Sequence, residues 1–502
     1  MIPYEQAGND GSHGALAASQ LAGQAGSFGS AGPKLRRALG LWSATATSSG
    51  LAFAAMDYLA VVSVATYAAG TSAWLAILVA GVLALLVAGI FSELNGLYPS
   101  AAGIRLYMSR AMGNRTALSV TFAYMTTIVA VIAADAFLIG AAIQHVLHEP
   151  TVLAYVWIVV LVGMAITANL LGVKLTGAVQ NIVTYTVLAS TTALSLVAIF
   201  NVPGPLRRPL ALLHAGPHNA IEAVAYGVFL YAAFEWVTTT AEEVRSPATT
   251  SKALFIAPGI LFVVTAVFAL ALTHAVPFAS SHHSPYPQLL LGRAALGEIG
   301  ELWMLATTVL TAINTFNGGF LTASRFLYAA ARDGNLPRVF CSLNLKAVPW
   351  FPVLVLGATS ALVAAAVFLT RQWLLLVAVG ATLEALIYAC AAWCVLALRR
   401  RDTRKRSFYL PMAPVLCVAG MVIFAVLGLA SAFSNPANPS RLSVLPAAVV
   451  AVIGCIATAY VLIAIPKLQA KAAARARAAQ PRRRPMRTIS SEAPSDSGSG
   501  QL

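Results

Sequence analysis

The sequence predicts an all-α membrane protein with twelve transmembrane helices. Hydrophobic residues make up 59% of the 502 residues, charged residues only 10%, and the mean hydropathy is +0.78. A soluble domain carries about 25% charged residues, so this chain has too little polar surface to stay dissolved and needs lipid as its solvent. A helix that crosses a membrane needs about 20 apolar residues, and twelve stretches of the chain approach that length.

The expected helices follow one another along most of the chain. They cover residues 41–68, 73–97, 116–146, 152–172, 178–201, 219–241, 254–276, 300–331, 350–369, 373–398, 411–433 and 443–465. An even number of spans places both termini on the same side of the membrane.

The charge distribution identifies that side as the cytoplasm. The net charge is +15, and all but five of the 32 Lys and Arg residues fall in the two tails and in the loops on the side of the tails. An excess of Lys and Arg marks cytoplasmic segments, so we expect a multi-pass protein of the cell (plasma or inner) membrane. No DNA- or RNA-binding motif accompanies the charge, which excludes a nucleic-acid partner.

Two terminal segments are expected to lie outside the bilayer. Residues 1–37 are rich in Gly, Ala and Ser, and we interpret them as a disordered cytoplasmic tail. Residues 467–502 begin with an Ala/Arg-rich stretch and end in a Ser/Gly-rich one, which predicts a basic and then disordered cytoplasmic tail.

Four acidic residues lie well inside expected spans: Asp57, Asp135, Glu235 and Glu384. A central Asp costs about 2.5–3.5 kcal/mol on the insertion scale, so each of these residues is a functional candidate by default. The alternative is a structural carboxyl group that is hydrogen-bonded to a neighbouring helix. That alternative is favoured for Glu384 and is equally open for Asp135.

Asp57 and Glu235 occupy matching positions near the middle of the first and sixth spans. In transporters built from inverted repeats, the first helix of each repeat is broken at the midplane, and the exposed helix ends bind substrate. This correspondence predicts two substrate-binding stretches, Ala55, Met56, Asp57 and Tyr58 in one half and Ala233, Phe234, Glu235 and Trp236 in the other.

Three motifs resemble the amino acid–polyamine–organocation (APC) superfamily of permeases. Residues 91–103 (FSELNGLYPSAAG) resemble the exit of the family's second helix, and residues 234–247 resemble its broken sixth helix with a Glu-Glu-x-x-x-Pro exit. Residues 324–337 (SRFLYAAARDGNLP) are similar to the end of its eighth helix. The three motifs occur in the family's order and at its distances.

The resemblance implies a LeuT-type fold with a 5+5 inverted repeat. The first repeat would cover residues 38–201 and the second 202–399, with helices 11 and 12 in residues 400–466. It also implies a secondary active transporter that moves amino acids or related organic amines by alternating access. Charges at the inner helix ends would then pair in one gate state and separate in the other, although simple interfacial anchoring is an equal alternative; these residues are Glu93, Glu242, Glu243, Arg332 and Asp333.

The sequence departs from the family at both helix breaks. The family's first break reads Gly-x-Gly, whereas Ala55-Met56-Asp57 stands here, and Ala233 replaces a glycine of the sixth helix. A carboxylate at residue 57 would repel a substrate carboxylate and attract an ammonium group. The hypothesis is therefore a cationic amine or basic amino acid near Asp57 and Glu235, with Phe234 and Trp236 as cation–π faces.

Proton symport, sodium coupling and substrate exchange are all open as the mode of coupling, with proton coupling favoured. Asp57, Asp135 and Glu235 are the candidate proton carriers, because burial favours the neutral form of a carboxyl group. No cofactor or metal site is indicated, and the histidines form no catalytic constellation, so the chain is not expected to be an enzyme. The alternative function is a transporter-like nutrient sensor that binds an amine or amino acid without net transport.

Overall fold

A computed structural model describes residues 39–470 apart from residues 69–71, 101–102, 173–176, 204–215, 242, 436–437 and 440. The predicted tail at residues 1–37, and the predicted tail at 467–502 beyond residue 470, lie outside this part. Eleven described helices are long and apolar enough to cross a membrane, and one bent pair makes a twelfth span. The predicted all-α fold with twelve transmembrane helices is confirmed.

The spans fall into two groups of five and a final pair. The first group is α2 (Leu41–Ala52) with α3 (Met56–Tyr67), α4 (Ala73–Leu97), α6 (Asn114–Val146), α7 (Leu153–Leu170) and α8 (Gly177–Asn201). The second group is α9 (Pro217–Phe229) with the 3-10 helix η3 (Phe234–Thr240), α10 (Pro247–Ala275), α12 (Pro287–Arg332), α13 (Trp350–Thr370) and α14 (Trp373–Arg401). The last two spans are α15 (Ala413–Phe433) and α16 (Leu445–Ala459), which continues into η5 (Tyr460–Ala464).

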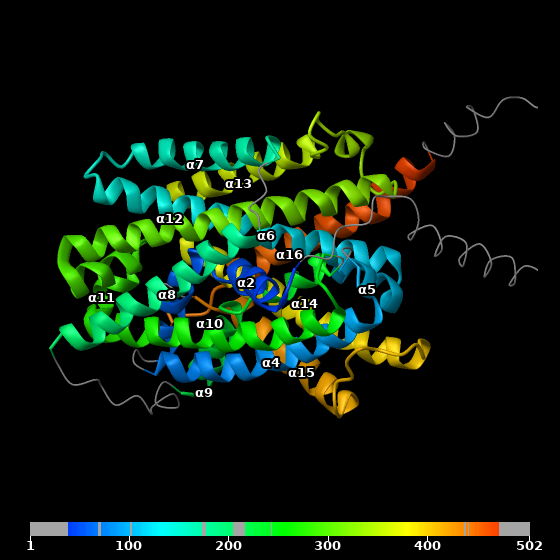
Figure 1. The fold of residues 1–502 in the computed structure, drawn as a ribbon, viewed down its shortest axis with the longest axis horizontal. Helices are drawn as coiled ribbons and strands as arrows, with labels where there is room; N and C mark the ends of the chain where they lie inside the picture. The colour runs from blue at the N-terminus through cyan, green and yellow to red at the C-terminus, as the bar shows by residue number, and fades with distance from the viewer. Residues whose placement is uncertain are drawn as a thin grey trace, which may run out of the picture.

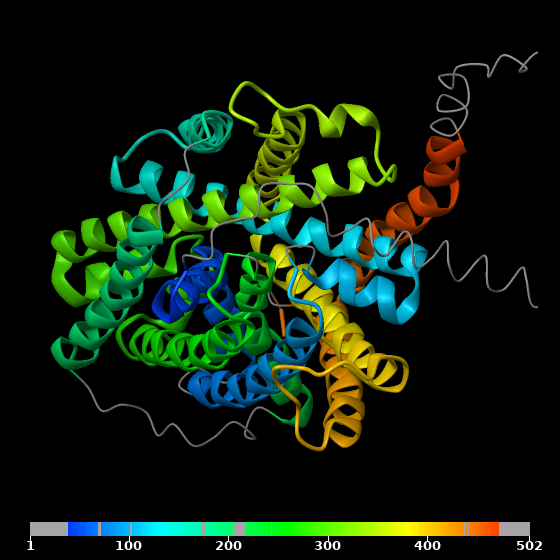
Figure 2. The same ribbon diagram turned by 45° about the vertical axis from the view of Figure 1, so that its right-hand side comes forward.

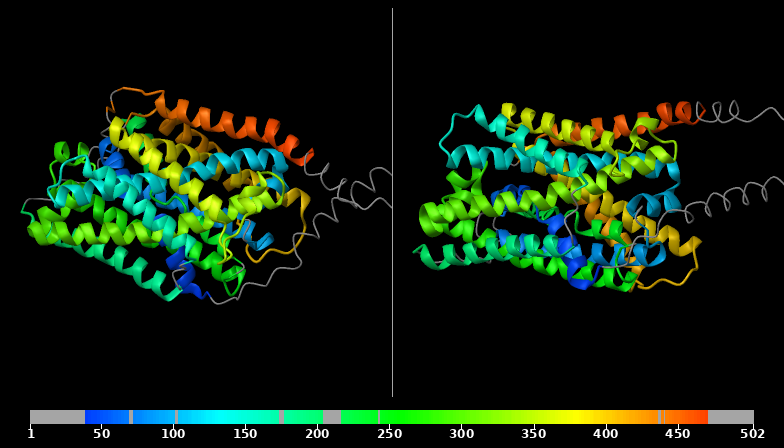
Figure 3. Two further views of the ribbon diagram at one scale, coloured as in Figure 1. Left: turned by 90° about the horizontal axis from the view of Figure 1, so that it is seen from above. Right: turned by 45° about the horizontal axis from the view of Figure 1, so that its top comes forward.

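In the described part of the chain, three short helices lie between the spans: α5 (Gly103–Met112), α11 (Phe278–His282) and η4 (Arg338–Cys341). The spans run side by side along one direction, with α7 next to α13 at one edge of the bundle (Figure 1). The outermost span, α16, lies along the rim (Figure 3) and has only 17% of its apolar window buried. By contrast, the span made of α9 and η3 is 89% buried, which places it in the middle of the bundle.

The long part of the eighth span agrees with its predicted extent of 300–331, but a short helical arm that was not predicted precedes it. Helix α12 covers 46 residues, and non-helical backbone at Leu296 and Gly297 divides it into a short arm and a long span. The chain folds sharply there because Gly297 has φ +64° and because Gly292 and Gly300 touch: a Cβ built on Gly300 would lie 2.1 Å from the Gly292 carbonyl oxygen. The arm is too short to cross a bilayer, so a search for apolar windows of spanning length misses it.

Both groups begin with a broken span. Helices α2 and α3 meet at an angle of 63°, and α9 and η3 are separated by residues 230–233. Figure 2 shows the first broken span, in dark blue, surrounded by other helices. The two breaks are tied together, because the Ser48 hydroxyl donates a hydrogen bond of 2.6 Å to the Phe234 carbonyl oxygen.

The two broken spans are also joined at the ends near Leu39 and Val244. The Leu39 N–H donates to the Glu243 carbonyl oxygen at 3.0 Å, and the Arg245 N–H donates to the Leu39 carbonyl oxygen at 3.1 Å. These bonds form a parallel β-bridge between Leu39 and Val244. The halves of the first and sixth spans on this side are therefore one mechanical unit.

Ala233 adopts a left-handed backbone conformation, with φ +69° and ψ 0°. This conformation costs a residue with a Cβ atom about 1–2 kcal/mol and costs glycine nothing. We expect Ala233→Gly to leave the melting temperature of the detergent-solubilised protein unchanged or raise it. The matched control is Ala232→Gly, which lies outside the left-handed region and should lower the melting temperature. A lower melting temperature for Ala233→Gly than for Ala232→Gly would contradict the strain argument.

Candidate functional site

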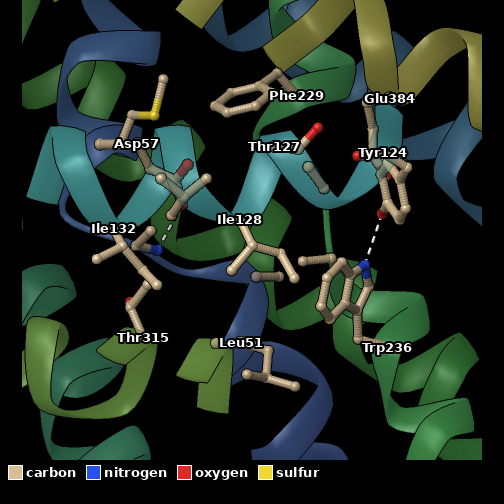
Figure 4. A pocket seen from close by; sticks show the side chains of 17 residues that line it. Leu51, Asp57, Tyr124, Thr127, Ile128, Ile132, Phe229, Trp236, Thr315 and Glu384 are labelled. Carbon is tan, nitrogen blue, oxygen red and sulfur yellow. Dashed lines mark hydrogen bonds between the residues drawn. The ribbon is translucent and has the colours of Figure 1, made fainter. Parts of the chain in front are cut away.

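A cavity of about 50 Å³ lies where the two broken spans meet. A single water molecule needs about 10–15 Å³ by the same kind of measure, so the cavity has room for a few waters but not for an amino acid. Figure 4 shows side chains from several helices converging on it. The space between these side chains is small, and a larger ligand requires them to move.

The wall of the cavity is mostly apolar and comes from both halves of the fold. It is formed by Leu51, Ala52, Ala54, Met56 and Asp57 at the first break, by Tyr124, Thr127, Ile128, Val131 and Ile132 of α6, by Phe229, Ala232, Ala233 and Trp236 at the second break, by Thr315 and Gly319 of α12, and by Glu384 of α14. Among these lining residues Asp57 and Glu384 are the only charged types. The wall therefore combines apolar surface with acidic groups and offers no positive charge.

Two carboxyl groups surround the start of α3. The Ala54 N–H donates to Asp57 Oδ2 at 3.1 Å, and the Met56 N–H donates to Asp135 Oδ1 at 2.9 Å. Both side chains are almost completely buried, with exposures of 3% and 0%. Free N–H groups and the helix dipole make a helix N-terminus favourable for negative charge, which explains why two buried carboxyl groups are tolerated at this place.

A second cluster joins the other break to α6 and α14. The Tyr124 hydroxyl lies 2.6 Å from Glu235 Oε1 and 3.2 Å from Glu384 Oε1. It also accepts a hydrogen bond of 2.6 Å from the Trp236 indole N–H, drawn in Figure 4. The Tyr388 hydroxyl donates to Glu235 Oε2 at 3.2 Å.

Counting protons in this cluster shows that it needs one on a carboxyl group. The Tyr124 hydroxyl has one proton, which it can give to Glu235 or to Glu384 but not to both. The Tyr124 oxygen already accepts a hydrogen bond from Trp236 and can accept one more. The carboxyl group that does not receive the Tyr124 proton is therefore satisfied when it is protonated and donates to the Tyr124 oxygen. Glu235 already accepts from Tyr388, which leaves Glu384 as the better proton holder. The arrangement can therefore hold and release one proton beside the cavity.

The structure brings part of the predicted substrate site to the cavity wall. Met56, Asp57, Ala233 and Trp236 line it, whereas Ala55, Tyr58, Phe234 and Glu235 lie behind the wall. The Tyr58 hydroxyl instead bonds Thr191 of α8 at 3.0 Å, and Glu235 reaches the cavity only through Tyr124.

The sequence did not single out Tyr124 or Thr315, which line the cavity from two different helices. A tyrosine inside an apolar helix of a membrane protein is common, so no sequence signal separates Tyr124 from a packing residue. Glu384 was identified as an intramembrane acid, but its contact with Tyr124 requires the fold to be known.

Glu93 lies at the end of α4 and is enclosed by positive charge. Its two carboxylate oxygens accept hydrogen bonds of 2.7 Å from Arg399 and Arg406, and Oε2 also accepts one of 2.9 Å from the Leu410 N–H. Glu93 is 2% exposed and the Arg406 side chain 4% exposed. This cluster fastens α4 to the end of α14 and the loop that follows it.

A second ion pair reinforces the same loop. Asp402, just after α14, binds the Arg404 guanidinium at 2.6 Å and accepts a hydrogen bond of 2.7 Å from the Tyr98 hydroxyl. The hydrogen-bonded Arg404 guanidinium holds the pKa of Asp402 well below its usual range. Asp402 therefore stays ionised throughout the physiological pH range.

Two of the other predicted gate residues form ion pairs that connect distant segments. Asp333 at the end of α12 accepts from Arg105 of α5 at 2.9 Å, and Glu243 after η3 lies 3.6 Å from Arg325 of α12. Within the described part of the chain no ion pair includes Arg332, and Glu242 lies outside the described residues. The Glu243 pair joins the sixth span directly to the eighth.

We expect Glu93→Gln to lower the free energy of unfolding by about 3–5 kcal/mol, because it leaves the two guanidinium groups without their shared carboxylate. The matched control is Glu243→Gln, whose half-exposed pair should contribute about 0–1 kcal/mol. The measurement is the thermal melting of both variants in detergent. Equal melting temperatures for the two variants would contradict the structural role of Glu93.

The amino acid permease family model matches residues 44–475 of this chain. The chain belongs to the amino acid permease family. It is 28% identical over 351 residues to an uncharacterized transporter of Mycobacterium tuberculosis, a match that covers 66% of this chain and 74% of the relative. It is 25% identical over 312 residues to an aromatic amino acid transport protein of Corynebacterium glutamicum, covering 57% of this chain and 65% of the relative.

Solved structures confirm the predicted LeuT-type fold of this permease. A manganese transporter of Eremococcus coleocola, in complex with an aromatic bis-isothiourea compound, is similar with a TM-score of 0.55 at 13% identity. The match covers 86% of this chain and 95% of that one. In the described part of the permease no three His, Cys, Asp or Glu side chains come together as metal ligands. The permease is a multi-pass membrane transporter, and its family is one of transporters rather than enzymes.

Proposed function

We propose that this permease is a secondary active transporter that carries amino acids or related organic amines by alternating access. The observation that carries the proposal is the cavity between the two broken spans, which is lined by both halves of the fold. A substrate site at the midplane between repeats is the arrangement expected of such transporters.

Alternating access is supported by the contacts on the inner side of the cavity. The bonds from Leu39 to Glu243 and from Ser48 to Phe234 make the inner halves of the first and sixth spans move together. The pair between Glu243 and Arg325 connects this unit to α12 by one half-exposed contact that a rocking motion can break. The inner gate is therefore assigned to Glu243, Arg325, Arg105 and Asp333.

Proton coupling is supported by the cluster around Tyr124. A proton shared between Glu235 and Glu384 lies beside the cavity, where the binding of a substrate and the state of the proton affect each other. Asp57 and Asp135 cap α3, so we assign them to substrate binding and to support of the break rather than to proton transfer.

The proposed location is the plasma or inner membrane, with both termini in the cytoplasm. The concentration of Lys and Arg near the inner loops supports this orientation. The proposed repeats are residues 38–201 and 202–399, since each group of five spans begins with a broken helix.

The test is uptake into proteoliposomes of labelled amines and amino acids, with and without an imposed pH gradient. We expect saturable accumulation that rises when the outside is acidic. Binding without flux would support the nutrient sensor instead, and accumulation that depends on sodium but not on pH would remove the proton-coupling assignment.

A further inference from the structure

The backbone donors of the cavity-lining residues at the first break are all used by the chain itself. Ala54 donates to Asp57 Oδ2 at 3.1 Å, Met56 to Asp135 Oδ1 at 2.9 Å and Asp57 to the Ala54 carbonyl oxygen at 3.1 Å. No N–H group of these lining residues is left at this end of α3 for a substrate.

Free N–H groups at a helix N-terminus are the usual means of binding a carboxylate or phosphate. Here Asp57 and Asp135 occupy that place with carboxyl groups from within the chain. A substrate carboxylate would meet donors that are already used and carboxyl oxygens that themselves accept hydrogen bonds, so it would lose its own hydration without gaining partners. The break is therefore built to exclude an anion.

The rest of the cavity wall also disfavours an anion. None of the lining residues is Lys, Arg or His, so no side chain offers a positive charge to a carboxylate. The charged types in the wall, Asp57 and Glu384, are both acidic and both buried. Carboxyl oxygens accept hydrogen bonds, and an ammonium group supplies three donors.

We propose that the substrate of this permease is an organic amine without a carboxylate: an ammonium group on an apolar body. The ammonium would be held by Asp57, and the apolar body would contact Phe229 and the face of Trp236. The inference rests on the transport function proposed above and narrows its substrate class from amino acids and amines to amines alone.

The test compares amino acids with the amines that lack only the carboxylate. The pairs are leucine with isopentylamine, phenylalanine with phenethylamine and lysine with cadaverine, each used to compete for uptake in proteoliposomes and to stabilise the purified protein against heating. At least one amine is expected to act at a concentration about 100-fold lower than its parent amino acid, since an unpartnered buried carboxylate is strongly rejected.

Parent amino acids that act within about threefold of their amines would overturn the inference and leave the transporter assignment intact. Stabilisation by an amine without any flux would keep the inference about the site and reject the transport function. If no amine produces either stabilisation or flux, the inference is overturned.

A variant tests the role of the break directly. Asp57→Gly removes the internal cap and frees the Ala54 N–H, so we expect the preference for amine over parent amino acid to fall at least about tenfold. The matched control is Asp57→Asn, whose amide oxygen can still accept from Ala54 and which should admit amino acids less well than Asp57→Gly. Equal admission of amino acids by both variants would contradict the role assigned to the occupied donors.

Discussion

Glu384→Gln should abolish the response of uptake to a pH gradient while leaving exchange of bound substrate measurable. The substitution keeps the size of the side chain and its contact with Tyr124 but removes the group that can lose a proton. Uptake into proteoliposomes with an acidic exterior is then expected to equal uptake without a gradient. Counterflow, in which internal unlabelled substrate drives the entry of labelled substrate, needs no net proton movement and should persist.

The control for this prediction is Glu301→Gln. Glu301 is also buried, but it pairs with Arg293 and His145 at the far end of α6 from Tyr124 and does not line the cavity. Its variant should retain the response to pH. Uptake by Glu384→Gln that still rises several-fold on external acidification would show that the proton is carried elsewhere.

Asp57→Asn is expected to weaken the binding of a transported amine at least about 30-fold. Removing one partner of a buried, hydrogen-bonded charge pair costs about 2–5 kcal/mol, and each 1.4 kcal/mol is a factor of ten in the dissociation constant. Calorimetry on the purified protein measures the constant directly. The amide can still cap Ala54, so the fold of the break should be kept.

Asp135→Asn separates a local charge effect from a change of shape. Asp135 supports the same break through Met56 but does not line the cavity. Its neutral variant should therefore change the dissociation constant by less than Asp57→Asn does. Affinity in Asp57→Asn equal to that of the wild type at neutral pH would remove Asp57 from the substrate site.

Hydropathy and the three motifs were enough to predict the twelve spans and the position of both breaks. The spans are long apolar segments with strong local signals, and an acidic residue inside such a segment is easily recognised. The breaks followed from two such residues, Asp57 and Glu235, at matching positions in the two halves.

The partners of these residues could not be predicted, because they depend on packing between distant segments. Tyr124 contacts Glu235 across 111 positions of sequence and Glu384 across 260. Nothing local indicates that a tyrosine in α6 will lie between two carboxyl groups. The interpretation of Glu384 as a structural group follows from considering that residue in isolation, whereas its neighbours give it a place at the cavity.

The β-bridge between Leu39 and Val244 has a consequence for how the chain is made. The first span enters the membrane before Leu39 can pair with Val244. Val244 is synthesised only about 200 residues after Leu39, and those residues take tens of seconds at common translation rates. During that time the first span has a polar break in the membrane, and the backbone groups of Leu39 lack their hydrogen-bond partners. In a nascent chain arrested before the sixth span, the first span should therefore be open to cleavage by quality-control proteases. Protection from these proteases should appear abruptly once the sixth span has emerged.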